Sequence, residues 1–282
     1  MIHKLEIIII KLLYKLLMLF PEKSRYKLGA FLGNLTYKYV NDRREITYKN
    51  LKIAFPEKSD EELEKIAKKS FEIIGKTFLA GLWTHTIIDS DKITIENKEL
   101  LDKVYNRNKG VILVGLHMGN IEANLKLAKY YKSYDVIRKQ KNPYLDKFMN
   151  DNRRKTGINL IYKGKTTIRE LIKAIKSKNV ISLFSDHYDM SGMDLDFFGK
   201  STPMSTGAIT IALKYDAPIV LFFNTHNEDD TSTIHIKKEF ILFKTGNLEK
   251  DIELNMKRLI KEYEEIIKEY PEQWMWLHKR WR

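Results

Sequence analysis

The apolar positions nearest the N-terminus form one helical run that is interrupted by lysines. The stretch from Ile7 to Phe20 reads IIIIKLLYKLLMLF, which is shorter than the roughly 20 apolar residues of a spanning helix. At about 100° per residue, Lys4, Lys11 and Lys15 fall within about 40° of one another and form one basic stripe. The pattern predicts a membrane-associated helix over residues 1–23, with its lysines at the lipid headgroups and its apolar side chains below them. A short tilted span and an amphipathic helix packed on its own domain are the alternatives, and the interrupting charges disfavour a cleaved signal peptide.

Residues 24–86 have helical spacing throughout and are predicted to form a helical cap. Ser59 is a favourable N-cap, and Glu62 three residues later completes a capping box. The apolar positions that follow have helical spacing and are expected in the core: Leu63, Ile66, Ala67, Phe71 and Ile74.

From about residue 110, short apolar runs alternate with helical segments. Strands are predicted at Val111–Leu116, Asp135–Arg138, Ile158–Tyr162, Val180–Ser185 and Pro218–Asn224, and helices at 121–131, 143–156, 166–178 and 203–215. This alternation indicates an α/β fold in which helices flank a central, mostly parallel sheet. A late hairpin is predicted from Thr233–Lys237 and Phe240–Phe243. One domain over 24–282 is the simplest division, with a helical cap (24–86), an α/β core (110–248) and a C-terminal helix and tail (249–282).

The amino-acid composition limits the kinds of binding partner and of catalytic chemistry that the protein can have. The 282 residues contain 50 Lys plus Arg against 37 Asp plus Glu, a formal net charge of +13, and no cysteine. The lack of cysteine excludes disulfides, thiolate metal sites and a cysteine nucleophile. Residues 132–178 carry 14 basic and 4 acidic side chains, so most of the excess lies in this segment. Such a concentration favours an anionic partner over evenly solvated helix faces, and no nucleic-acid-binding motif accompanies it.

The candidate chemistry lies where the first predicted core strand ends. His117 follows that strand, Gly119 allows a sharp turn, and Asn120 is a favourable N-cap for the next helix. In open α/β sheets, ligands bind beyond the carboxyl ends of strands. His117 and Glu122 would not meet on a continuous helix, but a turn at Gly119 allows the carboxylate to accept a hydrogen bond from the imidazole. The pair is therefore a candidate general base and its orienting partner.

These residues resemble a known family. The sequence His117-Met-Gly-Asn-Ile-Glu122 resembles the H-x4-D/E motif of glycerolipid-type acyltransferases, and more closely the H-F-G-N-W-E block of the lipid A biosynthesis (lauroyl/myristoyl-type) acyltransferase family. Four further collinear blocks are similar: Tyr48-Lys-Asn-Leu51 with Ala54-Phe-Pro-Glu-Lys58; Arg138, Asn142-Pro143, Arg154 and Gly157; Ser185-Asp186, Phe197-Phe-Gly199 and Thr206-Gly207; and Pro271-Glu-Gln-Trp-Met-Trp276 with His278 and Arg280-Trp281.

The resemblance implies transfer of a fatty acyl chain from a thioester to a hydroxyl of a lipid A precursor or related glycolipid. It implies that His117 is the general base and Glu122 its partner, and Arg154 and Asp186 match two further functional positions. Arg154 is expected either to hold an acidic group of a substrate or to brace the site through an ion pair with Asp186. Arg138, Gly119 and Asn120 are further candidate substrate-binding residues, with backbone N–H groups near Gly119 as candidate oxyanion donors.

The implied partners are acyl carrier protein, a membrane lipid and a phosphorylated glycolipid acceptor, at the cytoplasmic face of a bacterial inner membrane. Acyl-acyl carrier protein or acyl-coenzyme A would be the co-substrate, and neither a cofactor nor a metal is expected. A lysophospholipid or other glycolipid acyltransferase is the alternative of the same chemistry, because fold and motif fix the acceptor poorly. A non-catalytic basic membrane-surface binding protein is the alternative of another class.

The chain departs from the family pattern at two places and has a cluster of tryptophans near its C-terminus. His187 stands where the family usually has Gln, and the segment Asn224-Thr-His-Asn227 lacks an Arg that the family tends to place there. Trp274, Trp276 and Trp281 alternate with cations near the C-terminus, which suits either a membrane interface or a packed helix end.

Overall fold

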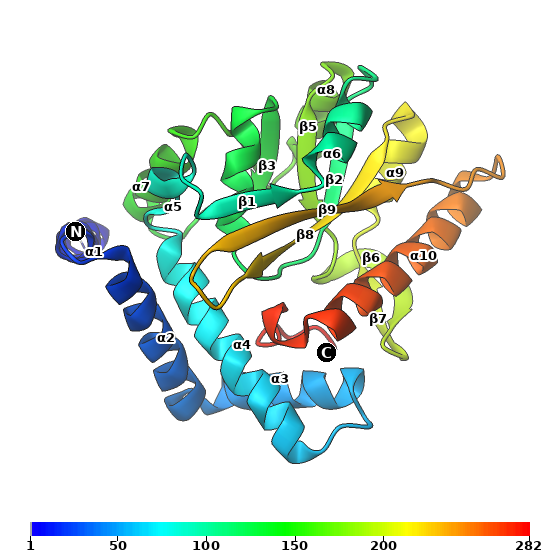
Figure 1. Ribbon diagram of the computed structural model, residues 1–282. Coiled ribbons are helices and arrows are strands. Elements are labelled where there is room, and N and C mark those ends of the chain that lie inside the picture. The colour runs from blue at the N-terminus through cyan, green and yellow to red at the C-terminus, as the bar shows by residue number, and fades with distance from the viewer. Residues whose placement is uncertain (1) are drawn as a thin grey trace.

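The computed structural model describes residues 2–282 and has a central seven-stranded sheet with helices on both faces (Figure 1). Met1, part of the predicted segment 1–23, lies outside the described residues. The helices are α1 (Ile2–Met18), α2 (Glu22–Tyr39), α3 (Asn41–Ala54), α4 (Asp60–Ala80), α5 (Thr84–Ile87), α6 (Lys98–Tyr105), η1 (Ile121–Lys129), α7 (Pro143–Arg154), α8 (Thr167–Lys176), α9 (Gly207–Tyr215), α10 (Leu248–Glu269) and η2 (Pro271–Gln273). The strands are β1 (Ile93–Glu96), β2 (Val111–Gly115), β3 (Ser133–Ile137), β4 (Asn159–Tyr162), β5 (Val180–Phe184), β6 (Tyr188–Phe197), β7 (Lys200–Met204), β8 (Ile219–His226) and β9 (Ser232–Phe240).

The strand order in the large sheet is β1-β9-β8-β2-β5-β3-β4, and all neighbours are parallel except β8 and β9. The predicted α/β class with a mostly parallel sheet is therefore confirmed. Because β2, β5, β3 and β4 run in one direction, the residues that follow these four strands come together at one edge of the sheet.

The central strand β2 shows why this sheet needs helices on both faces. Its even positions, Ile112 and Val114, belong to the core formed with α8, α9 and α10. Its odd positions, Val111 and Leu113, belong to a second core that includes α6 and η1. Side chains alternate across a strand, so a continuous apolar run is buried only when both faces are covered.

The cap helices α2, α3 and α4 pack closely on one another. Gly33 on α2 lies so near α4 that a Cβ atom there would be 2.1 Å from the backbone oxygen of Phe71, which leaves room for glycine alone. The capping box predicted for α4 is confirmed, since the Ser59 hydroxyl accepts from the Glu62 amide and the Glu62 carboxylate accepts from the Ser59 amide.

Other predictions from the sequence have mixed outcomes. The late hairpin is wrong, because Thr233–Lys237 belongs to one long strand, β9, which pairs with β8 and β1. The four-residue strand β1 and the separate hairpin β6–β7 are additions. The segment after His117 is helical as predicted but has 3₁₀ geometry. The C-terminal tryptophans are buried, so they form part of the packed core.

The N-terminal helix α1 contacts the rest of the protein along one stripe. Ile7, Tyr14 and Leu17 point inward, and the Tyr14 ring packs edge-on against Phe148 of α7 at 5.4 Å between ring centroids. The outward face has apolar side chains that are 47–62% exposed: Leu5, Ile8, Ile9, Leu12, Leu13 and Leu16. Within residues 2–282, no helix has both the length and the hydropathy needed to span a bilayer.

Candidate active site

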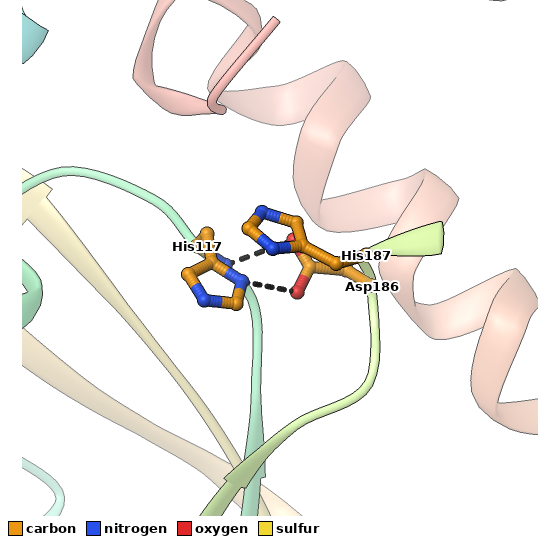
Figure 2. Close-up of side chains that lie close together, drawn as sticks. All are labelled: His117, Asp186 and His187. Atoms are coloured by element: carbon orange, nitrogen blue, oxygen red, sulfur yellow. Dashed lines mark hydrogen bonds and ion pairs between the residues drawn. The ribbon is translucent and has the colours of Figure 1, made fainter. Parts of the chain in front are cut away.

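The candidate site lies beyond the carboxyl ends of β2 and β5, which are neighbours in the sheet. His117 comes two residues after β2 ends, and Asp186 comes two residues after β5 ends. Parallel neighbours in register bring these two positions together although they are 69 residues apart in the chain. Figure 2 shows the His117 ring facing the Asp186 carboxylate, with the ring of His187 beside them.

Asp186 holds His117 through both of its oxygen atoms. The imidazole Nδ1 lies 2.7 Å from Oδ1, and the backbone N–H of His117 donates to Oδ2 at 2.9 Å. The Trp274 indole N–H also donates to Oδ2, at 2.8 Å. The Asp186 side chain is fully buried, whereas the His117 side chain keeps 20% of its surface exposed. The carboxylate is therefore an internal support, and the imidazole is the group that a substrate can reach.

The protonation state of this pair follows from its contacts. Burial alone would raise the pKa of the Asp186 carboxyl, but the interactions with His117 outweigh burial and hold that pKa well below its usual range. An ionised carboxylate is only an acceptor, so the short contact requires the His117 proton to be on Nδ1. The lone pair of Nε2 is then free to accept a proton.

The C-terminal tail completes this support. Its segment Gln273–Met275 runs antiparallel to the His117 loop, with Gly119 N–H donating to the Gln273 carbonyl at 2.9 Å and Met275 N–H to the His117 carbonyl at 3.1 Å. This pairing places the Trp274 indole against Asp186. The tail in turn is held by Asn50 of α3, whose side-chain amide donates to the carbonyls of Trp276 and His278.

Glu122 is not the partner of His117, so that prediction is wrong. Its carboxylate forms a two-point ion pair with Arg153 of α7, in which Nε donates to Oε2 at 3.0 Å and Nη2 to Oε1. Both side chains are mostly buried, with 13% and 20% of their surfaces exposed. Asp186, from the adjacent strand, reaches the imidazole and leaves Glu122 to tie η1 to α7.

Arg154 and Arg138 lie at the surface. Arg154 is 47% exposed and lies 3.5 Å from an oxygen of Asp151 on its own helix, so the alternative in which it braces Asp186 is wrong. Arg138 is exposed and follows the carboxyl end of β3, at the same edge as His117. A contact between either guanidinium and a substrate stays a prediction.

Gly119 and Asn120 shape the turn. Gly119 has φ +51°, and a Cβ atom there would lie 2.7 Å from the Asn224 carbonyl oxygen. The backbone N–H groups of His117, Met118 and Gly119 all donate hydrogen bonds within the protein. The N–H groups expected to stabilise an oxyanion near Gly119 therefore already have acceptors. Asn120 occupies the N-cap position of η1, but its buried side chain makes no cap hydrogen bond and donates to Ser232 Oγ at 3.1 Å.

His117, Asp186 and His187 bring potential metal ligands within 4.8 Å of one another. The two imidazole rings, however, stack face to face, with 3.5 Å between centroids and 6° between planes. Nitrogen lone pairs lie in the ring plane, so the lone pairs of stacked rings run parallel and do not converge on one ion. The arrangement suits hydrogen bonding and stacking better than coordination.

The sequence predicted a functional role for Arg154, whereas the structure turns the neighbouring Arg153 inward. The helical spacing within α7 could have indicated that Arg153 faces inward. Asp146, Asn150 and Arg153 lie on one face at spacings of four and three, and the first two are buried. The resemblance placed Trp274 and His278 in the C-terminal signature, and Trp274 was also one of the tryptophans that alternate with cations. No local pattern indicated that Trp274 donates to Asp186 or that His278 lies against His187.

Comparisons with known proteins agree with the resemblance. A family model described as bacterial lipid A biosynthesis acyltransferase matches residues 4–282. The lipid A biosynthesis lauroyltransferase of Escherichia coli (strain K12) is 26% identical over 272 residues, which is 93% of this chain and 86% of that protein. The lipid A biosynthesis palmitoleoyltransferase of the same organism is 23% identical over 263 residues, which is 90% of this chain and 84% of that protein.

One solved structure is also similar, the 1-acyl-sn-glycerophosphate (LPA) acyltransferase PlsC from Thermotoga maritima. It covers 84% of this chain and 97% of its own, with 16% sequence identity and a TM-score of 0.37. That likeness is too distant to carry a functional argument. The match over residues 4–282 does carry one: the chain belongs to the bacterial lipid A biosynthesis acyltransferase family and is an acyltransferase.

Proposed function

We propose that the protein transfers a fatty acyl chain from the thioester of acyl carrier protein, or of coenzyme A, to a hydroxyl of a lipid A precursor, with His117 as general base. The observation that carries this proposal is the contact between His117 Nδ1 and the fully buried Asp186. It fixes one tautomer and leaves Nε2 as a base at the carboxyl edge of the sheet.

The reaction follows from that geometry. Nε2 accepts the proton of the acceptor hydroxyl as its oxygen attacks the thioester carbonyl carbon. The C–O bond forms, the C–S bond breaks, and the imidazolium returns the proton to the leaving thiolate. Asp186 stabilises the positive charge on the imidazole while the proton is held there. No residue of the protein needs to become acylated, which agrees with the lack of cysteine.

The basic segment 132–178 supports an anionic donor or acceptor. Lys139 follows β3 and Lys163 follows β4, so both lie at the same edge as His117. Both side chains are exposed. Acyl carrier protein, coenzyme A and a phosphorylated glycolipid are all anionic, and cations beside the site would attract each of them over long range.

The outward face of α1 supports association with the cytoplasmic face of the inner membrane. Exposed contiguous apolar side chains are costly in water and favourable in the lipid interface. Lys4, Lys11 and Lys15 are exposed on the same helix and lie between this apolar face and the stripe that contacts α7. That order suits a helix lying flat, with its lysines at the headgroups.

The catalytic proposal is tested by transfer of a labelled acyl chain to lipid in membranes that contain the protein. His117→Ala is expected to remove the transfer while leaving the thermal unfolding curve in place. Transfer at the wild-type rate by the folded variant would refute the base assignment. Comparison of acyl-acyl carrier protein with acyl-coenzyme A in the same assay identifies the donor.

The charge proposal has a matched control within the segment. Lys139→Gln with Lys163→Gln neutralises two cations at the site edge, whereas Lys132→Gln with Lys176→Gln does so at the opposite end of the strands. The first pair is expected to raise the donor KM by about 3- to 10-fold at low salt, and the second to leave it unchanged. Equal effects of the two pairs would show that the position of the charge does not matter.

The membrane proposal is tested by flotation with vesicles that contain anionic lipid. Leu12 on α1 and Ile168 on α8 are each 57% exposed. Leu12→Asn is expected to lower the bound fraction, and Ile168→Asn to leave it unchanged. Equal binding by both variants and the wild type would place the lipid contact elsewhere.

A further inference from the structure

Three imidazole rings form a stack that starts at the candidate base. His187 lies over His117 with 3.5 Å between ring centroids and 6° between planes. His278 of the C-terminal tail lies against His187 at 4.1 Å and 11°. The three rings come from three separate segments, which follow β2, β5 and η2 respectively, so the stack is a product of the fold and not of local spacing.

The middle ring, His187, forms no hydrogen bond with the described residues that would explain its placement. Its Nε2 atom is buried and unpaired within residues 2–282, as is Nδ1 of His278. Its contacts are therefore mainly through its two faces, and one of those faces covers the His117 ring. A half-buried flat ring at this distance restricts rotation of the neighbouring imidazole about its side-chain bonds.

A buried positive charge lies near this stack. Arg280 is fully buried, and its Nη1 donates to neutral groups only, Thr202 Oγ1 at 2.7 Å and the Pro203 carbonyl at 3.3 Å. Its Nε and Nη2 have no hydrogen-bond partner in the described part of the chain. Its positive charge acts on the nearby histidines and is opposed by the carboxylate of Asp186.

The groups around His187 largely favour its neutral form. Burial lowers the pKa of His187 to about 3, and His117, His278 and Arg280 contribute in the same direction, against the carboxylate of Asp186. The pKa of His278 is also lowered, first by burial and then by His117, Arg280 and Arg282, again against Asp186. At neutral pH the stack therefore contains uncharged rings beside the base.

We propose that His187 is a positioning residue for the acyl transfer: its uncharged ring, stacked on the His117 imidazole, holds the plane of that imidazole. A charged ring at stacking distance would repel the imidazolium that forms when Nε2 of His117 accepts the proton of the acceptor hydroxyl, so an uncharged His187 favours that step. A neutral ring instead presents its electron-rich face to that imidazolium and stabilises it. This inference rests on the proposed role of His117 as base.

The first test separates stacking from simple filling of space. His187→Phe keeps a flat ring that does not titrate, and His187→Leu keeps an apolar side chain without a flat face. The kcat of the Phe variant is expected to exceed that of the Leu variant by about 10-fold or more, with similar KM values, because a tilted base loses alignment and not binding. Equal kcat values for the two folded variants would overturn the positioning role.

The second test concerns the charge of the middle ring. Burial is the main reason why the pKa of His187 is lowered to about 3, so the acid limb of kcat/KM in His187→Phe is expected to match that of the wild type between about pH 5 and 7. A protonation in this range that the wild type shows and His187→Phe lacks would mean that the ring carries charge during the assay, and would overturn its uncharged role.

His117→Ala, measured in the same assay, separates the role of His117 as base from the role of His187 in positioning it. If it retains transfer, the proposed base is wrong. If it abolishes transfer while the variants at His187 are equal to each other, the base stands and the positioning role fails.

Discussion

Replacement of Asp186 by asparagine tests the site through a single oxygen atom. The carboxylate accepts three hydrogen bonds, from His117 Nδ1, the His117 backbone N–H and the Trp274 indole N–H. An asparagine has one acceptor oxygen and one NH₂ group in the same volume. If the oxygen stays with the two N–H groups that now bind Oδ2, the NH₂ group faces Nδ1 and donates to it. The proton of His117 then moves to Nε2, and the base is lost.

The expected loss in kcat is the value of a positioned general base, about 10²- to 10⁴-fold, or roughly 2.7–5.5 kcal/mol in the activation free energy. The donor KM is expected to change little, because the fully buried Asp186 does not contact a substrate. The opposite amide orientation places the NH₂ group against two N–H donors. Either orientation therefore leaves a poorly satisfied buried group, which costs about 1–3 kcal/mol of unfolding free energy.

The assay is steady-state transfer of a labelled acyl chain by wild type and variant, with thermal unfolding of each measured in parallel. Trp274→Phe is the matched control, since it removes one hydrogen bond to the same carboxylate but leaves the acceptor of Nδ1 in place. Its kcat is expected to fall by less than about 10-fold. A folded Asp186→Asn enzyme within about 3-fold of the wild-type kcat would refute the tautomer argument.

Three further predictions concern stability. Gly119→Ala should cost about 1–3 kcal/mol in denaturant unfolding, because φ is +51° and the new Cβ would lie 2.7 Å from backbone, whereas Gly164→Ala enters open space and should be neutral. Glu122→Ala should cost about 3–5 kcal/mol by leaving Arg153 mostly buried and unpaired, and adding Arg153→Met should recover much of that loss. Burial, followed by the charge of Lys76, lowers the pKa of His226 to about 4. Its stabilisation is therefore complete above the unfolded pKa of about 6.5 and is lost as pH falls toward 4, by up to about 1.4 kcal/mol per pH unit. Urea unfolding between about pH 7.5 and 5 should show a smaller slope for His226→Phe, and an unchanged slope would contradict this account.

The parts of the fold that sequence patterns predicted are those with strong local periodicity. The apolar runs of β2 and β5 are five residues long and mostly buried. Their ends therefore predicted the edge of the sheet at which His117 lies. The hairpin β6–β7 was missed although Met193, Leu195 and Phe197 alternate with polar residues, because acidic side chains such as those between them are also typical of loops. Strand β1 has four residues and depends on pairing with β9, which local sequence does not reveal.

The site could be located from sequence, but its pairing could not. His117 was identified from its place after a strand. The choice between Glu122 and Asp186 as its partner depends on strand order, which sets β5 beside β2. Once Asp186 reaches the imidazole, Glu122 is free to pair with Arg153, and neither distance is encoded in local spacing.

The contact between α1 and α7 has a consequence for protein engineering. Asn142, the N-cap of α7, donates to the His3 carbonyl and to the Glu6 carboxylate, and Phe148 of α7 packs on Tyr14. The same helix carries Arg153 at its other end. A shortened chain that lacks α1 would therefore uncover the helix that supplies the partner of Glu122. Such a chain is a poor route to a detergent-free enzyme, and polar substitutions on the outward face of α1 leave α7 covered.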